Sequence, residues 1–137
     1  MISKGELRET VISYERKSSE ISFIDPWKTT IMNEKELFKA ACCNLSESFE
    51  TNPSVDVAFT DALSGAKQIQ MLGLAGQYTQ VSLEQMPGIR GVASNAGLAY
   101  VPGAWINSIQ VSKGMASVVN GFESVSGQIN VELHKSD

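Results

Sequence analysis

The sequence predicts an α+β fold, with a small mixed β-sheet of about four strands, short helices and long loops. Several short segments alternate apolar and polar residues, which is typical of half-buried strands. Only one segment, which begins at Glu34, has the apolar spacing of a helix. Ten of the eleven glycines lie between Gly65 and Gly127, where they favour short elements joined by turns and loops.

The expected strands and helices lie between these turns and loops. Strand candidates are residues 8–13, 21–24, 55–59, 67–72, 78–83, 105–112 and 128–133; the sheet itself is expected from residues 69–72, 78–83, 106–111 and 128–133. Asn33 is a suitable cap for the helix that begins at Glu34, and its apolar period continues to Ser48. Residues 116–119 are expected to form a short turn or helix.

Length and charge restrict the class of protein. The chain has 137 residues and a formal charge of −4, which suits one domain and argues against a nucleic-acid partner. Residues 1–50 carry 16 of the 26 charged side chains, whereas residues 64–131 carry five. Such a charge-poor stretch is a poor free surface. It fits either a compact sheet with tight turns or a domain that something else encloses.

Residues with reactive side chains do not assemble into a catalytic or metal site in the sequence. His134 has no partner nearby in the sequence, and the spacing of the methionines is irregular. Cys42 and Cys43 point about 100° apart if they lie on a helix, so they do not share a face. We expect both thiols to be reduced and buried. No catalytic residue, metal ligand or cofactor is predicted, and the chain is not expected to be an enzyme.

The C-terminal third carries a longer motif. Residues 106–121 read INSIQVSKGMASVVNG, and GQINV follows at residues 127–131. In order and spacing this resembles the final segment of the plug domain of TonB-dependent outer-membrane receptors. Residues 29–37 resemble the entry to the first plug helix. Residues 39–56, 86–91 and 100–105 are similar to plugs of Bacteroidetes-type receptors, so the resemblance covers about residues 8–135.

Three positions depart from the family pattern. Leu72-Gly73 stands where many members have Arg-Gly, so the role of that arginine does not transfer to Leu72. The turn at residues 84–87 lacks the glycine that many members have before the proline. Lys113-Gly114-Met115 replaces Arg-Gly-Pro and keeps the positive charge. These differences leave the expected fold unchanged.

The resemblance implies a role in energised uptake. It implies a plug domain over residues 21–137 that occludes the receptor's own transmembrane β-barrel, engages an unknown transported ligand and couples to the C-terminal domain of TonB. The implied location is the outer membrane, with the plug inside the barrel lumen and accessible from the periplasm. Because no barrel strands follow Asp137, we expect an excised plug or a natural plug-only product. The alternative is a free-standing periplasmic interaction module with a plug-like fold.

Two sets of site residues follow. Residues 1–20 are expected to be an N-terminal extension whose Glu9, Thr10, Val11, Ile12 and Ser13 resemble a TonB box; the alternative is an ordinary edge strand. Loops 73–77 and 89–103 are expected to face the ligand. The residues expected to contact it are Arg90, Asn95, Tyr100 and Trp105. The alternative is that Tyr100 and Trp105 pack beneath their loop.

Overall fold

The computed structural model describes residues 19–22, 29–37, 39, 43–60, 62–63, 65–94 and 96–135. Six strands form one mixed sheet in the order β1-β2-β7-β8-β5-β6. They are β1 (Ser19–Ser22), β2 (Thr29–Asn33), β5 (Thr79–Leu83), β6 (Met86–Ile89), β7 (Ile106–Lys113) and β8 (Gly127–Leu133). The β5–β8 pair is parallel, and the other neighbouring pairs are antiparallel.

The predicted α+β class is confirmed, although the sheet has six strands instead of about four. The prediction that residues 69–72 join this sheet is wrong, because residues 67–70 belong to a separate two-stranded hairpin. β1, β2 and β6 are strands of the sheet that were not expected in it. Pro87 and Gly88 argue against a strand, but β6 lies at the edge of the sheet, where a missing backbone donor is tolerated. In β2, Asn33 is both the last residue of the strand and the residue before α1, so its cap signal indicates the helix and not the strand.

The remaining elements are short. β3 (Asp56–Phe59) and β4 (Lys67–Gln70) form a separate antiparallel hairpin. The one described α-helix, α1 (Glu34–Leu37), makes a single turn. Single turns of 3₁₀-helix complete the structure: η1 (Glu47–Phe49), η2 (Gly76–Tyr78), η3 (Gly91–Ser94), η4 (Gly97–Tyr100), η5 (Gly103–Trp105) and η6 (Val118–Asn120).

The prediction that the helix from Glu34 continues to Ser48 is therefore wrong, since α1 ends at Leu37. Asn44 gives the reason, because its side-chain Oδ1 accepts from the backbone N–H groups of Ser46 (3.1 Å) and Glu47 (3.3 Å). This local turn competes with helical hydrogen bonds and starts η1 instead. Cys43 lies in the bend before it as an exposed free thiol, so the predicted burial is wrong for Cys43. Cys42 lies outside the described residues.

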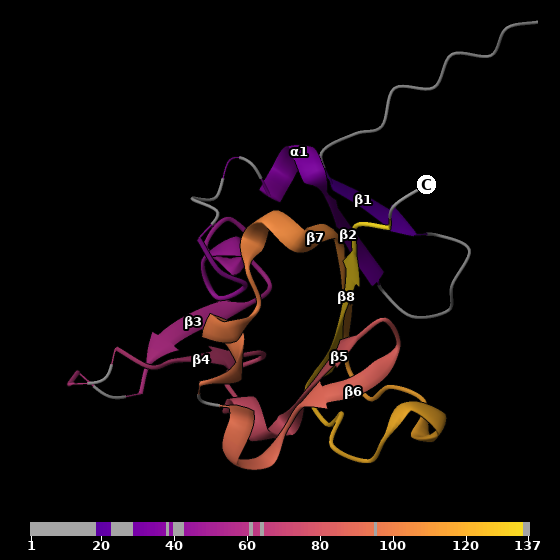
Figure 1. Ribbon diagram of the computed structural model, residues 1–137. Helices are drawn as coiled ribbons and strands as arrows, with labels where there is room; N and C mark the ends of the chain where they lie inside the picture. The colour runs from indigo at the N-terminus through magenta and orange to yellow at the C-terminus, as the bar shows by residue number, and fades with distance from the viewer. Residues whose placement is uncertain are drawn as a thin grey trace, which may run out of the picture.

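The apolar core lies on one face of the sheet. Ile109, Val111, Ile129 and Val131 alternate along β7 and β8 and are fully buried. Figure 1 views the sheet close to its edge and shows what lies on each side. The β3–β4 hairpin and residues 91–105 cover the core face, whereas the connection between β7 and β8, which contains η6, lies on the opposite side.

The register of the strands defines two ends of the sheet. At the Leu133 end, the start of β7 pairs with the end of β8, since Ile106 lies opposite Leu133. The start of β1 also lies toward this end, because Ser19 pairs with Met32 near the end of β2. At the Gly127 end, Lys113 lies opposite Gly127 and Thr79 begins β5.

Candidate functional site

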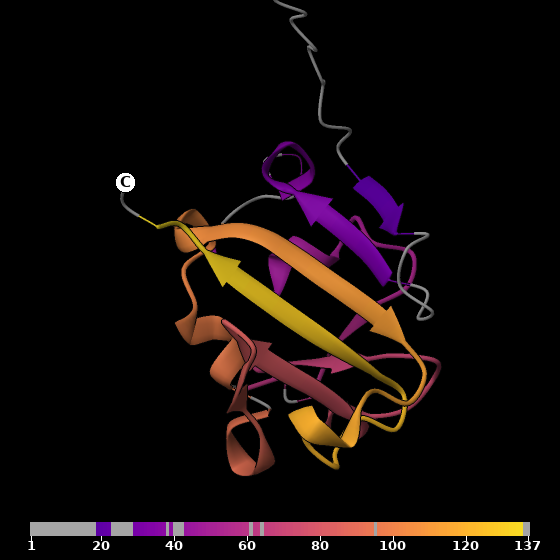
Figure 2. The ribbon, with the colours of Figure 1, turned by 90° about the vertical axis from the view of Figure 1, so that its right-hand side faces the viewer.

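The face of the sheet opposite the core is polar. Its side chains alternate with the core residues and align across three strands: Gln80 and Ser82 on β5, Gln128, Asn130 and Glu132 on β8, and Ser108, Gln110 and Ser112 on β7. Figure 2 looks onto this face, with β7 and β8 crossing its middle between β2 and β5. Because side chains alternate along a strand, the polar residues of each strand lie on one face. The pairing of β5 with β8 then brings the polar residues of these two strands side by side.

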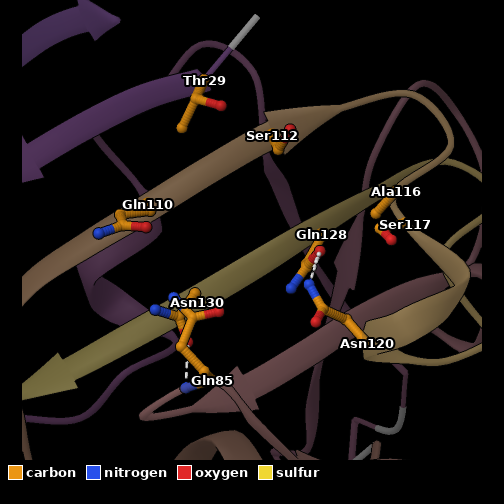
Figure 3. Close-up of a pocket in the computed structure, with 9 residues that line it drawn as sticks. All are labelled: Thr29, Gln85, Gln110, Ser112, Ala116, Ser117, Asn120, Gln128 and Asn130. Carbon is orange, nitrogen blue, oxygen red and sulfur yellow. Dashed lines mark hydrogen bonds between the residues drawn. The ribbon is translucent and has the colours of Figure 1, made fainter. Parts of the chain in front are cut away.

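A groove of about 170 Å³ opens on this polar face. Thr29 on β2, Gln85 in the β5–β6 turn, and residues of β7, β8 and the β7–β8 connection line it. Figure 3 shows all nine lining residues, and none of them is charged: Thr29, Gln85, Gln110, Ser112, Ala116, Ser117, Asn120, Gln128 and Asn130. This set was not predicted from the sequence, although the alternating Gln128, Asn130 and Glu132 indicated one polar strand face.

Carboxamides organise the floor of the groove. The Oδ1 of Asn130 accepts from the backbone N–H of Gln85 at 2.9 Å and lies 3.1 Å from the hydroxyl of Ser82. Asn120 donates through Nδ2 to the Oε1 of Gln128 at 3.4 Å (Figure 3) and accepts through its backbone oxygen from the Nε2 of Gln80. These bonds hold the β5–β6 turn and the β7–β8 connection against the central strands.

Glu132 is the acidic residue of the polar face. Its two carboxylate oxygens accept from the hydroxyl of Ser108 and the Nε2 of Gln110, each at 3.0 Å. Both donors are uncharged, so the charge of Glu132 is fixed in position by neutral neighbours on β7. The polar face therefore has a neutral groove with a carboxylate beside it, toward the Leu133 end.

The residues expected to face a ligand lie at both ends of the sheet. Arg90 follows Ile89, which pairs with Val81 near the start of β5, so Arg90 lies toward the Gly127 end. Trp105 lies at the Leu133 end, where its carbonyl accepts from the backbone N–H of His134 at 2.9 Å. Six residues of extended strand separate these two levels, or about 20 Å. One small ligand would therefore not contact both residues.

The aromatic side chains of this set are exposed. Tyr100 is 81% exposed and Trp105 is 62% exposed, so the alternative of packing beneath the loop is wrong for both. Leu98 is the buried residue of η4, and a Cβ on Gly97 would lie 2.8 Å from the side chain of Ile89. These contacts hold the loop against the core and leave Tyr100 outside. Asn95 and the candidate TonB box, Glu9 to Ser13, lie outside the described residues.

The described residues contain neither a metal-ligand cluster nor a membrane-spanning helix. Within these ranges, no three His, Cys, Asp or Glu side chains are grouped to hold a metal ion. Nor does any helix there have the length and apolar character needed to cross a membrane.

Comparisons with known proteins agree on one family. Residues 25–128 match the family model described as TonB-dependent Receptor Plug Domain. No curated protein sequence matches the chain. Among solved structures, P. aeruginosa FpvA bound to heterologous pyoverdines is 19% identical, with a TM-score of 0.68 over 84% of this chain and 15% of that one.

Two further receptors have the same fold. The ferric yersiniabactin uptake receptor FyuA from Yersinia pestis is 15% identical, with a TM-score of 0.63 over 81% of this chain and 17% of that one. The siderophore receptor PirA from Acinetobacter baumannii is 20% identical, with a TM-score of 0.63 over 80% of this chain and 17% of that one. This chain thus spans about a sixth of the receptors it matches. On the family match and the shared fold, the chain belongs to the TonB-dependent receptor plug domain family.

Proposed function

We propose that this chain is the gating and ligand-engaging plug of a TonB-dependent outer-membrane receptor. In this role residues 21–137 occlude the receptor's own β-barrel, contribute part of the ligand site and receive force from TonB in the periplasm. The role requires no catalysis by the chain. Two of the matched receptors are an FpvA bound to pyoverdines and a ferric yersiniabactin uptake receptor, so ferric chelates are the first class of ligand to screen for transport.

The polar sheet face is the observation that carries the proposal. A domain of this size normally covers both faces of a sheet or leaves one face covered with charges. Here the second face carries amides and hydroxyls, and the described part of the chain covers it only through the β7–β8 connection. The lumen of a transmembrane barrel is polar and hydrated. A hydrogen-bonding face whose groove lining is uncharged complements such a wall.

Exposed apolar side chains support enclosure by a second surface. Val118, Val119 and Phe122 in the β7–β8 connection are largely exposed, and Met115 lies beside them in the sequence. An apolar group of this kind on a small domain marks an interaction site more often than a free surface. The low charge of residues 64–131 agrees with this, since the same segment supplies most of the polar face.

The topology supports force entering at the edge of the sheet. β1 is an edge strand with four paired residues, and β2 is its neighbour in the sheet. Residues 1–20, the proposed N-terminal extension, lead into this strand. Addition of Glu9–Ser13 as a strand to TonB would pull on β1 before the central β7–β8 pair. An edge strand of the sheet would thus bear the load first.

Substitution at Val11 tests this coupling in the full-length receptor. Val11→Pro removes a backbone donor and opposes strand pairing, whereas Val11→Thr keeps the donor and the β-branched side chain. We expect Val11→Pro to abolish ligand uptake with unchanged ligand affinity, and Val11→Thr to transport normally. Normal uptake by Val11→Pro would rule out this segment as the coupling site.

A further inference from the structure

The two ends of the sheet face different sides of the membrane if the chain acts as the proposed plug. β1 begins at the Leu133 end, since Ser19 pairs with Met32, and β8 finishes there. Because the extension on which TonB is proposed to pull leads into β1, the Leu133 end faces the periplasm. The Gly127 end therefore faces the incoming ligand. Figure 1 shows the start of β1 and the end of β8 at the top and the loops of the Gly127 end at the bottom.

Two loops at the Gly127 end expose apolar side chains. Residues 71–78 join β4 to β5, and residues 90–94 follow β6. The turns η2 and η3 within these loops lie against each other. Apolar side chains that are grouped on a surface mark an interaction site, whereas scattered ones do not. We call the exposed apolar residues of the two loops the apolar loop patch: Leu72, Leu74, Tyr78 and Val92.

Leu72 occupies a backbone position that suits a different residue. Its φ of 55° and the φ of 76° at Gly73 lie in the left-handed region, and Met71 and Leu74 exchange backbone hydrogen bonds of 3.0 and 3.1 Å. This two-residue turn favours Asn-Gly. Leu72 is 64% exposed, so its side chain gains little from burial within the domain. A leucine at such a strained and exposed position indicates contact with a further molecule.

The two loops are held in place by contacts within the domain. The carbonyl of Tyr78 accepts from the backbone N–H groups of Val125 and Ser126, each at 3.0 Å. A Cβ on Gly76 would lie 2.9 Å from the carbonyl oxygen of Ile69, so the first loop packs closely on β4. A preformed surface of this kind binds a ligand without the free-energy cost of ordering its loops.

Arg90 is the charged residue of the two loops. It has no ion-pair partner among the described residues, so its guanidinium is available to an anionic group. The acidic residues nearby belong to other surfaces. Asp56 on β3 lines a separate groove with Glu50, and Glu123 lies in the β7–β8 connection, which Lys113 precedes. The apolar loop patch therefore combines exposed apolar area with one unpaired cation.

We infer that the ligand of the proposed receptor is an organic anion with a large apolar body, which packs on the apolar loop patch while its acidic group binds Arg90. The inference rests on the proposed function and deepens it by naming the class of ligand. Tyr78 offers an aromatic face on which a planar ring can stack. Trp105 lies at the Leu133 end and takes no part in this contact. The ferric chelates to screen first are those with an apolar face and a negative charge.

Two naphthalene probes of opposite charge test this ligand class on the 137-residue chain. Naphthoate carries the ring and a carboxylate, whereas naphthylmethylammonium carries the same ring and a cation. Amide chemical shifts in NMR titrations measure both dissociation constants and locate the bound probe. We expect naphthoate to bind about tenfold more tightly than naphthylmethylammonium, with the largest shifts at residues 72–78 and 90–94.

Leu72→Asn and Arg90→Gln separate the apolar contact from the ionic one. Asparagine adopts the left-handed region readily, so Leu72→Asn keeps the turn and should weaken both probes about threefold or more. Arg90→Gln should reduce the preference for naphthoate to less than about twofold. Met86→Asn, at a 67% exposed residue of the Leu133 end, is the apolar control. Lys113→Gln is the charge control, because β7 lies three strand spacings from β6, or about 14 Å. Both controls should bind as the wild type does.

Lack of naphthoate binding, or equal affinities of the wild-type chain for the two probes, would overturn the inference. Unchanged affinities in Leu72→Asn would do the same, as would shifts centred on Trp105 or on the polar groove. Failure of the proposed function is a separate result. It would appear as unchanged ion conductance of the receptor when the plug is deleted, whatever the probes bind.

Discussion

The carboxylate of Glu84 accepts a hydrogen bond from the backbone N–H of Leu133, with 2.7 Å between Oε1 and N. Its other oxygen lies 3.2 Å from the Nζ of Lys135, and its own N–H donates to the carbonyl of Val131 at 2.9 Å. A residue in the β5–β6 turn thus holds the end of the last strand. In the proposed receptor, this is where the chain leaves the plug.

The anchor predicts a specific pH dependence of stability. The Leu133 N–H, first, and Lys135, second, lower the pKa of Glu84 below its ordinary value. A carboxyl with a lowered folded-state pKa stabilises the fold above its unfolded pKa of about 4.3, and this contribution is lost as pH falls through the folded pKa. As the pH falls below about 5, we expect the free energy of unfolding to decrease less steeply in Glu84→Gln than in the wild type.

Urea midpoints of the isolated chain between pH 3 and pH 7 measure this effect. Glu123→Gln, which removes the same charge in the β7–β8 connection, is the control and should retain the wild-type slope. Identical slopes for wild type and Glu84→Gln would contradict the anchoring role.

The β5–β6 turn carries backbone strain. Glu84 and Gln85 have φ angles of 52° and 65°, in the left-handed region that favours glycine. Gln85→Gly keeps the N–H that donates to Asn130 and removes the unfavourable Cβ. We expect it to stabilise the domain by about 0.5–1 kcal/mol, measured by urea unfolding. Destabilisation would show that the side chain of Gln85 contributes more than its strained backbone costs.

Gly127 begins β8 in close contact with two other segments. A Cβ there would overlap the Sδ of Met71 and lie 2.6 Å from the carbonyl oxygen of Ser112. Because the carbonyl belongs to the neighbouring strand, it cannot move freely. We expect Gly127→Ala to destabilise the domain by roughly 1–3 kcal/mol.

Gly88→Ala is the matched control for Gly127→Ala. Its Cβ would meet the side chain of Leu83 at 3.4 Å, which is ordinary contact. We expect its free energy of unfolding, measured with urea, to remain within about 0.5 kcal/mol of the wild-type value. Equal effects of the two substitutions would show that close packing at Gly127 does not limit stability.

Local sequence patterns predicted some elements of the fold correctly, whereas others depend on side-chain contacts or strand pairing. The alternation of apolar residues in β5, β7 and β8 predicted these strands, because the period reflects which face each side chain occupies. The helix prediction was wrong at residues 44–48, because the Asn44 side chain forms a turn there that no apolar period records. Local composition also argued against the edge strand β6.

The groove depended on pairing that no local pattern encodes. Gln128 and Asn130 were visible on one strand, but their alignment with Gln80 and Ser82 requires the parallel β5–β8 pair. Likewise, loop composition indicated Arg90 and Trp105 as a set, whereas the strand register places them at opposite ends of the sheet. The composition of the loop identified exposed side chains but not their separation.

The exposed loop residues predict the location of ligand contact. We expect Arg90→Ala combined with Tyr100→Ala to weaken ligand binding by the receptor about tenfold or more, as loss of an arginine and an aromatic anchor does. A transport screen that begins with ferric pyoverdine and ferric yersiniabactin supplies the ligand. Isothermal titration then measures its affinity, with Phe59→Ala on the exposed β3 as the control. Unchanged affinity and uptake in the double variant would contradict this assignment.

The central claim is that this domain closes a pore, and ion conductance of the full-length receptor in a planar bilayer tests it most directly. We expect the intact receptor to conduct little and the receptor lacking residues 21–135 to form large, open channels. A Gly-Ser linker of equal length in place of those residues preserves the connectivity of the chain. Equal conductance of the intact and plug-deleted proteins would contradict the claim and favour a free-standing interaction module.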